Sequence, residues 1–311
     1  MITDEKSISV LIPNYDWDVT ELIKEIHRQL TDAQIPFEIL CFDDSKKSEF
    51  HKGNDNLNQL TNVTYRVNES SFSRAKNRNE LGNSAKYNYL LFLDGDAGLE
   101  ENHHFIENYL KHVNDQVIIC GGTAYHSSIP SDSSFQLRYA YGKSREELPT
   151  SIREKDPWAG FSAFNFLIPR KIFLKIKFNE ALSEYGHEDT LFGNDLKYNC
   201  VPILHINNPA LHLGLDSSSV FLEKTRKGVT NLRGMIDAGL VDEDLKLYAW
   251  YSRARKTLLT PVLGQLYNKL HKRWEKQLCG PNPSLKLFDL YKLAYLCSLP
   301  DLHKIPPKRK I

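Results

Sequence analysis

Short apolar runs alternate with amphipathic segments through roughly the first 120 residues of the chain. Each apolar run is five or six residues long and ends at polar or turn-forming residues, which is typical of buried strands. The intervening segments repeat apolar residues at helical spacing. The pattern predicts strands at 7–12, 37–42, 63–67 and 89–93, and helices at 19–30 and 73–85. Strand and helix in alternation predict an α/β fold with a mostly parallel, Rossmann-like nucleotide-binding sheet and flanking helices.

The pattern is less regular in the rest of the chain. Further strands are expected at 117–122 and 201–206, separated by a polar stretch at 127–156 that reads as a mobile loop region. From residue 217 onward the spacing is helical, and the basic tail at 306–311 is expected to fray. We therefore expect a domain at 1–215, divided into halves at 1–120 and 121–215, and a helical C-terminal region at 216–311.

Carboxylates follow two of the predicted strands directly. Asp94 and Asp96 come after the run at 89–93, and Asp43 and Asp44 come after the run at 37–42. Ligands of open α/β sheets bind beyond the carboxyl ends of the strands, and two carboxylates there could reach one hard cation. Asp and Gly are also common in turns, so these residues could instead be turn formers.

Composition narrows the classes of partner. The chain has 311 residues, 41% of them hydrophobic, and a net charge of +1, so no global field favours nucleic acid. Its five cysteines are scattered without the spacing of a zinc site, which favours a reducing cytoplasm. No run of apolar residues predicts a signal peptide or a membrane-spanning helix. We expect a cytoplasmic protein, with peripheral contact at the inner face of a membrane as an open alternative.

Several short motifs stand in a fixed order along the chain: Ile12-Pro13-Asn14-Tyr15, Asp43-Asp44-Ser45, Arg78-Asn79, Leu93-Asp94-Gly95-Asp96, Phe178-Asn179-Glu180, Gly186-His187-Glu188-Asp189-Thr190 and Pro209-Ala210-Leu211-His212-Leu213-Gly214. The series resembles glycosyltransferase family 2, enzymes of the GT-A fold, across roughly residues 7–214. Its acceptor-side segment, 158–189, is similar to the galactosyltransferase and chondroitin-polymerase types. The family often has a Trp at the position of Tyr185 and an acid at that of Leu191, so acceptor contacts stay open.

The resemblance implies a metal-dependent, inverting transfer of a sugar from a nucleotide-sugar to an acceptor hydroxyl. Asp96 corresponds to the direct metal ligand, and His212, in an expected turn, looks like a further ligand. Asp94 would contact the ribose or a metal-bound water. Carboxylate oxygen with one imidazole suits Mn²⁺, and Mg²⁺ is compatible once diphosphate oxygens join. A histidine in this position could also be a core or turn residue.

The resemblance also assigns the acceptor side. Asp189 would be the general base that removes the acceptor's proton, and Glu188 would bind acceptor hydroxyls. Adjacent acids are also favoured at a helix N-terminus by the helix dipole, and both roles can coexist. Aromatic rings that could stack on sugar faces or simply fill the core lie nearby, at Trp158, Phe161 and Phe164.

On the donor side, the nucleotide is expected to lie across Pro13, Tyr15 and Asp44, with the Tyr15 ring beside the base. A carboxylate at Asp44 would accept the imide N–H of uracil, which cytosine lacks, so a UDP-sugar is the expected donor. Arg78, in the basic helix at 73–85, would neutralise phosphate. The expected acceptor is a glycan or a lipid-linked saccharide, and nucleic acid is not an expected partner.

Three other classes of protein share parts of this pattern. A catalytically silent nucleotide- or sugar-binding module could share the fold. A nucleotidyltransferase usually has a glycine-rich basic loop after the first strand, whereas residues 13–18 are acidic and contain no glycine. A glycosidase needs a carboxyl pair around the scissile bond and gives the acids on the nucleotide side no role.

Overall fold

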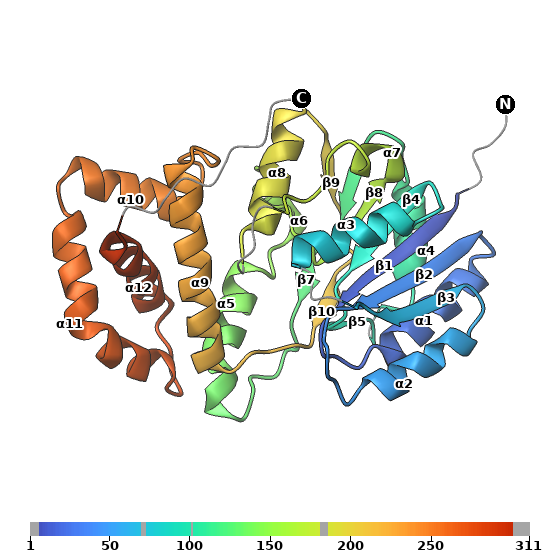
Figure 1. The fold of residues 1–311 in the computed structure, drawn as a ribbon, viewed down its shortest axis with the longest axis horizontal. Coiled ribbons are helices and arrows are strands. Elements are labelled where there is room, and N and C mark those ends of the chain that lie inside the picture. Colours follow the sequence, from blue (N-terminus) through green and yellow to red (C-terminus); the bar gives the residue numbers. More distant parts are fainter. Residues whose placement is uncertain (1–5, 70–72, 101, 181–185, 301–311) are drawn as a thin grey trace. The chain divides into compact units, whose positions relative to one another are not determined.

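The computed structural model of the protein describes residues 6–69, 73–100, 102–180 and 186–300 (Figure 1). The chain forms two compact units. The first comprises Met1–Tyr125, Glu146–Glu180 and Glu188–Gly214, and the second comprises His126–Arg145, Ala181–His187 and Leu215–Ile311. Tyr185 and the tail at 306–311, both singled out in the sequence, lie outside the described residues.

A seven-stranded sheet forms the centre of the first unit, in the order β3-β2-β1-β4-β8-β6-β9. All neighbouring pairs are parallel except those of β8, which runs antiparallel to both β4 and β6. The predicted α/β fold with a mostly parallel sheet is therefore confirmed. The strands are β1 (Ile8–Asn14), β2 (Phe37–Asp43), β3 (Val63–Val67), β4 (Tyr89–Leu93), β6 (Ile118–Cys120), β8 (Asn165–Pro169) and β9 (Ile203–His205).

Helices cover both faces of this sheet, because successive strand residues point to opposite faces and both sets are apolar. On one face, α1 (Thr20–Asp32) and α4 (Phe105–His112) pack on alternate residues of β1, β2 and β4. On the other face, α3 (Arg74–Ser84), α7 (Arg170–Phe173) and α8 (Glu188–Tyr198) contribute to the second core. The shorter helices are α2 (His51–Asp55), η1 (Asn56–Gln59) and α6 (Thr150–Arg153).

A small second sheet joins three distant parts of the first unit. Its order is β5-β10-β7, formed by Ala97–Gly98, Ala210–His212 and Thr123–Ala124. β10 runs antiparallel to β5 and parallel to β7. The pairing of these three strands places the residues that flank them close to one another.

The second unit is helical, with a core of its own. It contains η2 (Ser133–Phe135), α5 (Gln136–Arg145), α9 (Ser218–Asp237), α10 (Lys246–Lys256), α11 (Thr260–Leu278) and α12 (Leu285–Ser298). Aromatic side chains dominate its core, including Tyr267, Trp274, Phe288 and Tyr291. Among the described residues, no helix combines the length and the apolar character needed to cross a membrane.

The expectation of a mobile loop region at 127–156 was wrong. Two helices, α5 and α6, lie within it. Leu137 is fully buried in the helical core, and Arg153 is buried and donates hydrogen bonds to the carbonyl oxygens of Cys120 and Ile206. The stretch reads as polar because its few buried residues are isolated in the sequence, and an internal arginine fixes α6 where an apolar side chain would be expected.

Candidate active site

The turn that carries Asp94 and Asp96 is fixed against the ends of two neighbouring strands. The Gly95 N–H donates to the Pro13 carbonyl at 3.3 Å, and the Asp94 N–H donates to the Phe164 carbonyl at 3.1 Å. A Cβ on Gly95 would lie 2.4 Å from Asn14 Oδ1, so the turn needs glycine here. Pro13 thus contributes its backbone carbonyl to the placement of both carboxylates.

Asp96 and His212 face each other across the small sheet. Asp96 precedes β5, His212 ends β10, and the Leu213 N–H donates to the Asp96 carbonyl at 2.9 Å. The His212 Nε2 lies 3.1 Å from Asp96 Oδ2. A Cβ on Gly214 would lie 2.3 Å from the same oxygen, so glycine leaves the room that the Asp96 carboxylate occupies. His212 therefore lies at the end of a strand and not in the expected turn.

The imidazole of His212 is held on its other side as well. Its Nδ1 lies 3.0 Å from the Tyr125 hydroxyl, and that hydroxyl donates a short hydrogen bond to Glu146 Oε2. The rings of Tyr125 and Phe164 make edge contacts with the imidazole at centroid distances of 5.4 and 5.3 Å. Sequence reasoning missed Tyr125 and Glu146, since neither belongs to a recognisable motif.

Asp96 and His212 supply two ligand atoms, which suit a cation that is also bound by a ligand of the protein better than a cation held by protein side chains alone. Cis ligands of an octahedral ion with bonds of about 2.1 Å lie about 3 Å apart, and the observed separation is 3.1 Å. Among the described residues, no group of three or more His, Cys, Asp or Glu side chains has the arrangement of a metal site. Burial raises the pKa of Asp96, but the hydrogen bond and charge of His212 outweigh it and hold the pKa below its usual value. An anionic Asp96 with one imidazole fits Mn²⁺ or Mg²⁺ if a ligand supplies further oxygens.

Asp94 is paired with an arginine inside the protein. Arg78 of α3 is 3% exposed and donates from Nη2 to Asp94 Oδ1 at 2.7 Å. Burial raises the pKa of Asp94, and the charge of Arg78 opposes this rise. Among the described residues, none accepts a hydrogen bond from the Nε or Nη1 of Arg78. Arg78 is buried, unlike the exposed neighbours Arg74 and Lys76, and it keeps donors for a further partner.

Glu188 and Asp189 lie in the first turn of α8 and close to Arg78. Glu188 Oε1 is 3.9 Å from Arg78 Nη1 and 3.7 Å from Arg74 Nη1. Asp189 Oδ2 accepts from the Ala163 N–H at 3.0 Å. Burial and the charge of Glu188 raise the pKa of Asp189 to about 6, against the opposing charge of Arg78. The pair therefore occupies a helix N-terminus and also belongs, with Asp94 and Asp96, to one carboxylate cluster beside Arg78.

The adjacent acids after β2 have different surroundings. Asp43 is completely buried and accepts hydrogen bonds from Asn14, Ser45 and Tyr65 at distances of 2.5 to 3.0 Å. Asp44 is also buried, and its Oδ1 accepts from Asn68 at 2.8 Å. Asp43 thus holds the ends of β1, β2 and β3 together, which is a structural role. Sequence alone could not separate the two acids.

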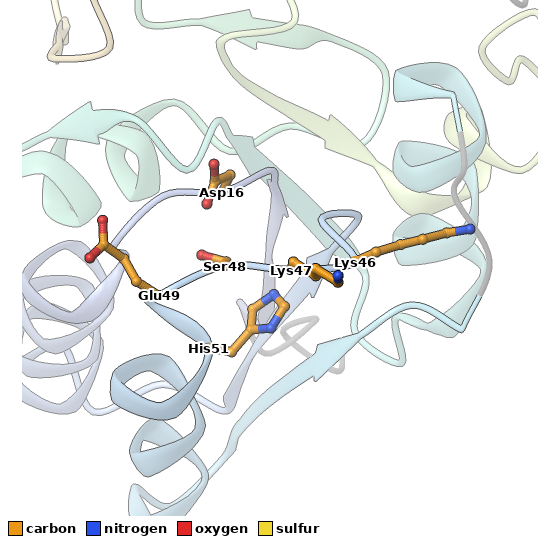
Figure 2. Close-up of a pocket in the computed structure, with 6 residues that line it drawn as sticks. All are labelled: Asp16, Lys46, Lys47, Ser48, Glu49 and His51. Carbon is orange, nitrogen blue, oxygen red and sulfur yellow. The ribbon is translucent and has the colours of Figure 1, made fainter.

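A pocket of about 600 Å³ opens beside the loops that follow β1 and β2 (Figure 2). Asp16 comes from the loop after β1, and the other lining residues come from the segment that follows β2. Tyr15, whose ring is 74% exposed, precedes Asp16 directly. No predicted site residue lines the pocket itself. Its lining residues are Asp16, Lys46, Lys47, Ser48, Glu49 and His51.

The aromatic residues expected near a sugar are mostly used for packing. Phe161 and Phe164 are each 8% exposed, and Phe161 packs against Phe166 and Phe192 in one core through edge and tilted ring contacts. The half-buried Trp158 donates its indole N–H to the Val201 carbonyl at 2.9 Å. Core packing therefore accounts for the two phenylalanines.

The fold and this carboxylate cluster define a class, the glycosyltransferases with a GT-A type sheet. The model of the glycosyl transferase family 2 matches residues 9–176, more than half of the chain. The chain belongs to this family, and the protein is a family 2 glycosyltransferase. The predicted family and enzyme class are confirmed.

Solved structures with related architecture include TarS of S. aureus. TarS 1–349 in complex with UDP-GlcNAc has 16% sequence identity and a TM-score of 0.49, over 94% of this chain and 90% of that one. The same fragment alone has a TM-score of 0.47 at 16% identity, with the same coverage. A longer TarS chain has 19% identity and a TM-score of 0.42, over 74% of this chain, and the match spans 40% of its length. Among curated proteins, none matches the chain.

Proposed function

We propose that this enzyme is a metal-dependent, inverting transferase that moves a sugar from a UDP-sugar to a hydroxyl of a glycan or a lipid-linked saccharide. The observation that carries the proposal is the position of Asp189. Its carboxylate lies near Arg78 and Asp94, and burial raises its pKa to about 6, a value suited to a general base near neutral pH.

The reaction is a single displacement at the anomeric carbon. The acceptor oxygen forms a bond to this carbon while the bond to the diphosphate oxygen breaks, and UDP leaves. Asp189 receives the acceptor's hydroxyl proton, and Glu188 accepts hydrogen bonds from neighbouring hydroxyls. Attack opposite to the leaving group inverts the anomeric configuration.

The leaving diphosphate carries the developing negative charge. Asp96 and His212 would hold a Mn²⁺ or Mg²⁺ ion together with diphosphate oxygens, and this ion would act as a Lewis acid. Asp94 would contact the ribose or a water. The Nε and Nη1 donors of Arg78 support a role for this side chain in binding an anionic or hydroxyl-rich part of the donor.

Asp44 is the basis for proposing uridine. Asp43 accepts hydrogen bonds from Asn14 of β1 and Tyr65 of β3, whereas Asp44 directly follows β2 and accepts a hydrogen bond from Asn68. A carboxylate accepts hydrogen bonds but cannot donate them, so it favours uracil, whose N3 carries a proton, over cytosine. Tyr15 has an exposed ring that could stack on the base.

Calorimetric titration of UDP, GDP and CDP, with and without Mn²⁺, tests the donor assignment. We expect UDP to bind most tightly and Mn²⁺ to strengthen its binding. Asp96→Ala should remove the Mn²⁺ effect, whereas Asp189→Asn should abolish transfer and leave UDP affinity nearly unchanged. Asp115→Asn is a matched control, because Asp115 is a surface carboxylate paired with Tyr89 and Lys171. Absence of nucleotide binding under all conditions would instead favour a catalytically silent module.

A further inference from the structure

A chain of polar contacts runs outward from Asp96 through His212 to two residues that the catalytic proposal does not use. The contacts join Asp96 Oδ2 to His212 Nε2 at 3.1 Å and His212 Nδ1 to the Tyr125 hydroxyl at 3.0 Å, and the Tyr125 hydroxyl then donates to Glu146. Tyr125 is 4% exposed and directly follows β7, beside β10 in the small sheet. The position of its hydroxyl is therefore fixed by backbone pairing as well as by hydrogen bonds.

The direction of these hydrogen bonds decides which nitrogen of His212 is protonated. A carboxylate only accepts, so the Tyr125 proton is committed to Glu146. The phenolic oxygen is then left to accept a hydrogen bond from His212 Nδ1–H. While no cation is bound, a proton on Nε2 can be donated to Asp96 Oδ2, which lies 3.1 Å away. A cation bound between these two atoms would displace that proton, and the remaining neutral imidazole, protonated on Nδ1, would present its Nε2 lone pair to the cation.

The backbone of Tyr125 is anchored by the adjacent glutamate. The Tyr125 N–H donates to Glu147 Oε2 at 2.8 Å, so residues 146 and 147 hold the tyrosine at both its hydroxyl and its backbone. The rings of Tyr125 and Phe164 both make edge contacts with the imidazole, at interplanar angles of 89° and 79°. Together with the two polar contacts of His212, these ring contacts restrict the orientation of its imidazole.

We propose that Tyr125 and Glu146 are positioning residues, which fix the tautomer and the orientation of His212 so that Nε2 and Asp96 Oδ2 present two lone pairs to one divalent cation. This inference rests on the metal dependence proposed above. Histidine ligands are commonly held in this way by a partner on the second ring nitrogen, and loss of such a partner typically weakens metal affinity by about 10- to 100-fold.

The test is calorimetric titration of Mn²⁺ into the full chain and its variants, each saturated with UDP, because Asp96 and His212 need diphosphate oxygens to complete the ligands of the ion. We expect Tyr125→Phe to weaken Mn²⁺ binding about tenfold. Glu146→Gln should weaken it less, because the amide oxygen still accepts from the tyrosine, and Glu146→Ala should weaken it more. Tyr89→Phe is the matched control, because Tyr89 also donates to a carboxylate, that of Asp115, but lies at the start of β4 away from the cluster. UDP affinity without metal should be the same in all variants.

A spectroscopic measurement separates positioning from a general loss of structure. In the protein loaded with diamagnetic Zn²⁺, the ring ¹⁵N shifts of His212, assigned through His212→Gln, should show a protonated Nδ1 and a metal-bound Nε2. In Tyr125→Phe, the shifts should show this state of His212 mixed with other tautomers or orientations of the imidazole. The inference would be overturned if Tyr125→Phe and Glu146→Ala bound Mn²⁺ as tightly as the wild type, or if His212 of the wild type bound the metal through Nδ1. Either result would leave the proposed function intact. A wild-type protein that binds no Mn²⁺ even when it is saturated with UDP would overturn the proposed metal dependence, and the inference with it.

Discussion

Replacing Asp189 with asparagine should make the protein more stable while it abolishes transfer. Burial and the charge of Glu188 raise the pKa of Asp189 from 3.8 to about 6. The ionised carboxylate therefore destabilises the folded state at neutral pH. A difference of about two pKa units corresponds to about 3 kcal/mol, an upper limit for a partly exposed side chain. The asparagine keeps an oxygen that can accept from the Ala163 N–H, so the substitution removes the charge and retains the hydrogen bond.

The size of this stability difference depends on pH, whereas its sign does not. Below about pH 4 the Asp189 carboxyl is protonated in both the folded and the unfolded chain, and it costs nothing. As pH rises through about 4 to 6, the unfolded chain ionises first and the wild type loses stability. Asp189→Asn does not titrate, so its advantage should be nearly complete at pH 8 and about half as large at pH 5.

Urea unfolding at pH 5 and pH 8, with hydrogen exchange of the β4 peptides as the readout for the first unit, measures this difference. Asp96→Asn is the control of opposite sign, because the pKa of Asp96 is lowered and its charge stabilises the fold at neutral pH. An Asp189→Asn protein no more stable than the wild type at pH 8, or a gain that is larger at pH 5, would refute the reasoning.

Three further predictions concern activity and nucleotide binding. Because Asp189 must be unprotonated to act as a base, the logarithm of kcat should rise with pH with unit slope up to about pH 6 and then level off, as a pH profile would show. Gly214→Ala places a Cβ 2.3 Å from Asp96 Oδ2 and should weaken the Mn²⁺-dependent part of UDP binding, measured by calorimetry, about tenfold or more. Gly53→Ala is the control, because a Cβ at this position has no atom within 4 Å and should leave that binding unchanged. Asp44→Asn should reduce the preference for UDP over CDP about tenfold or more, since an amide can donate to cytosine N3, and competition between the two nucleotides measures this.

The strand ends were predictable from the sequence because buried parallel strands leave continuous apolar runs that stop at polar residues. The runs before Asp43 and Asp94 therefore located the edge of the sheet and its carboxylates. Strand β8 was harder to recognise, since its antiparallel pairing with β4 and β6 has no signal in the residues themselves.

Residues that act through three-dimensional contacts were not predictable. Tyr125 and Glu146 belong to no motif, and only the pairing of β7 with β10 brings this tyrosine beside His212. The distinction between Asp43 and Asp44 likewise depends on which of them meets Asn14 and Tyr65 in the fold. The predicted domain division at residues 215 and 216 stays a prediction, as do the catalytic roles.

The small sheet also determines when, during synthesis of the chain, the two proposed metal ligands can come together. Asp96 and His212 are 116 residues apart, and only a two-residue and a three-residue strand bring them together. Contacts between such distant residues close a long loop, whose entropy must be offset by packing elsewhere before the contact forms. A chain emerging from the ribosome can thus build the sheet of β1, β2, β3 and β4 and display Asp94 and Asp96 well before His212 exists. Cation capture is expected to be a late event in biosynthesis, which makes it a natural reporter of completed folding.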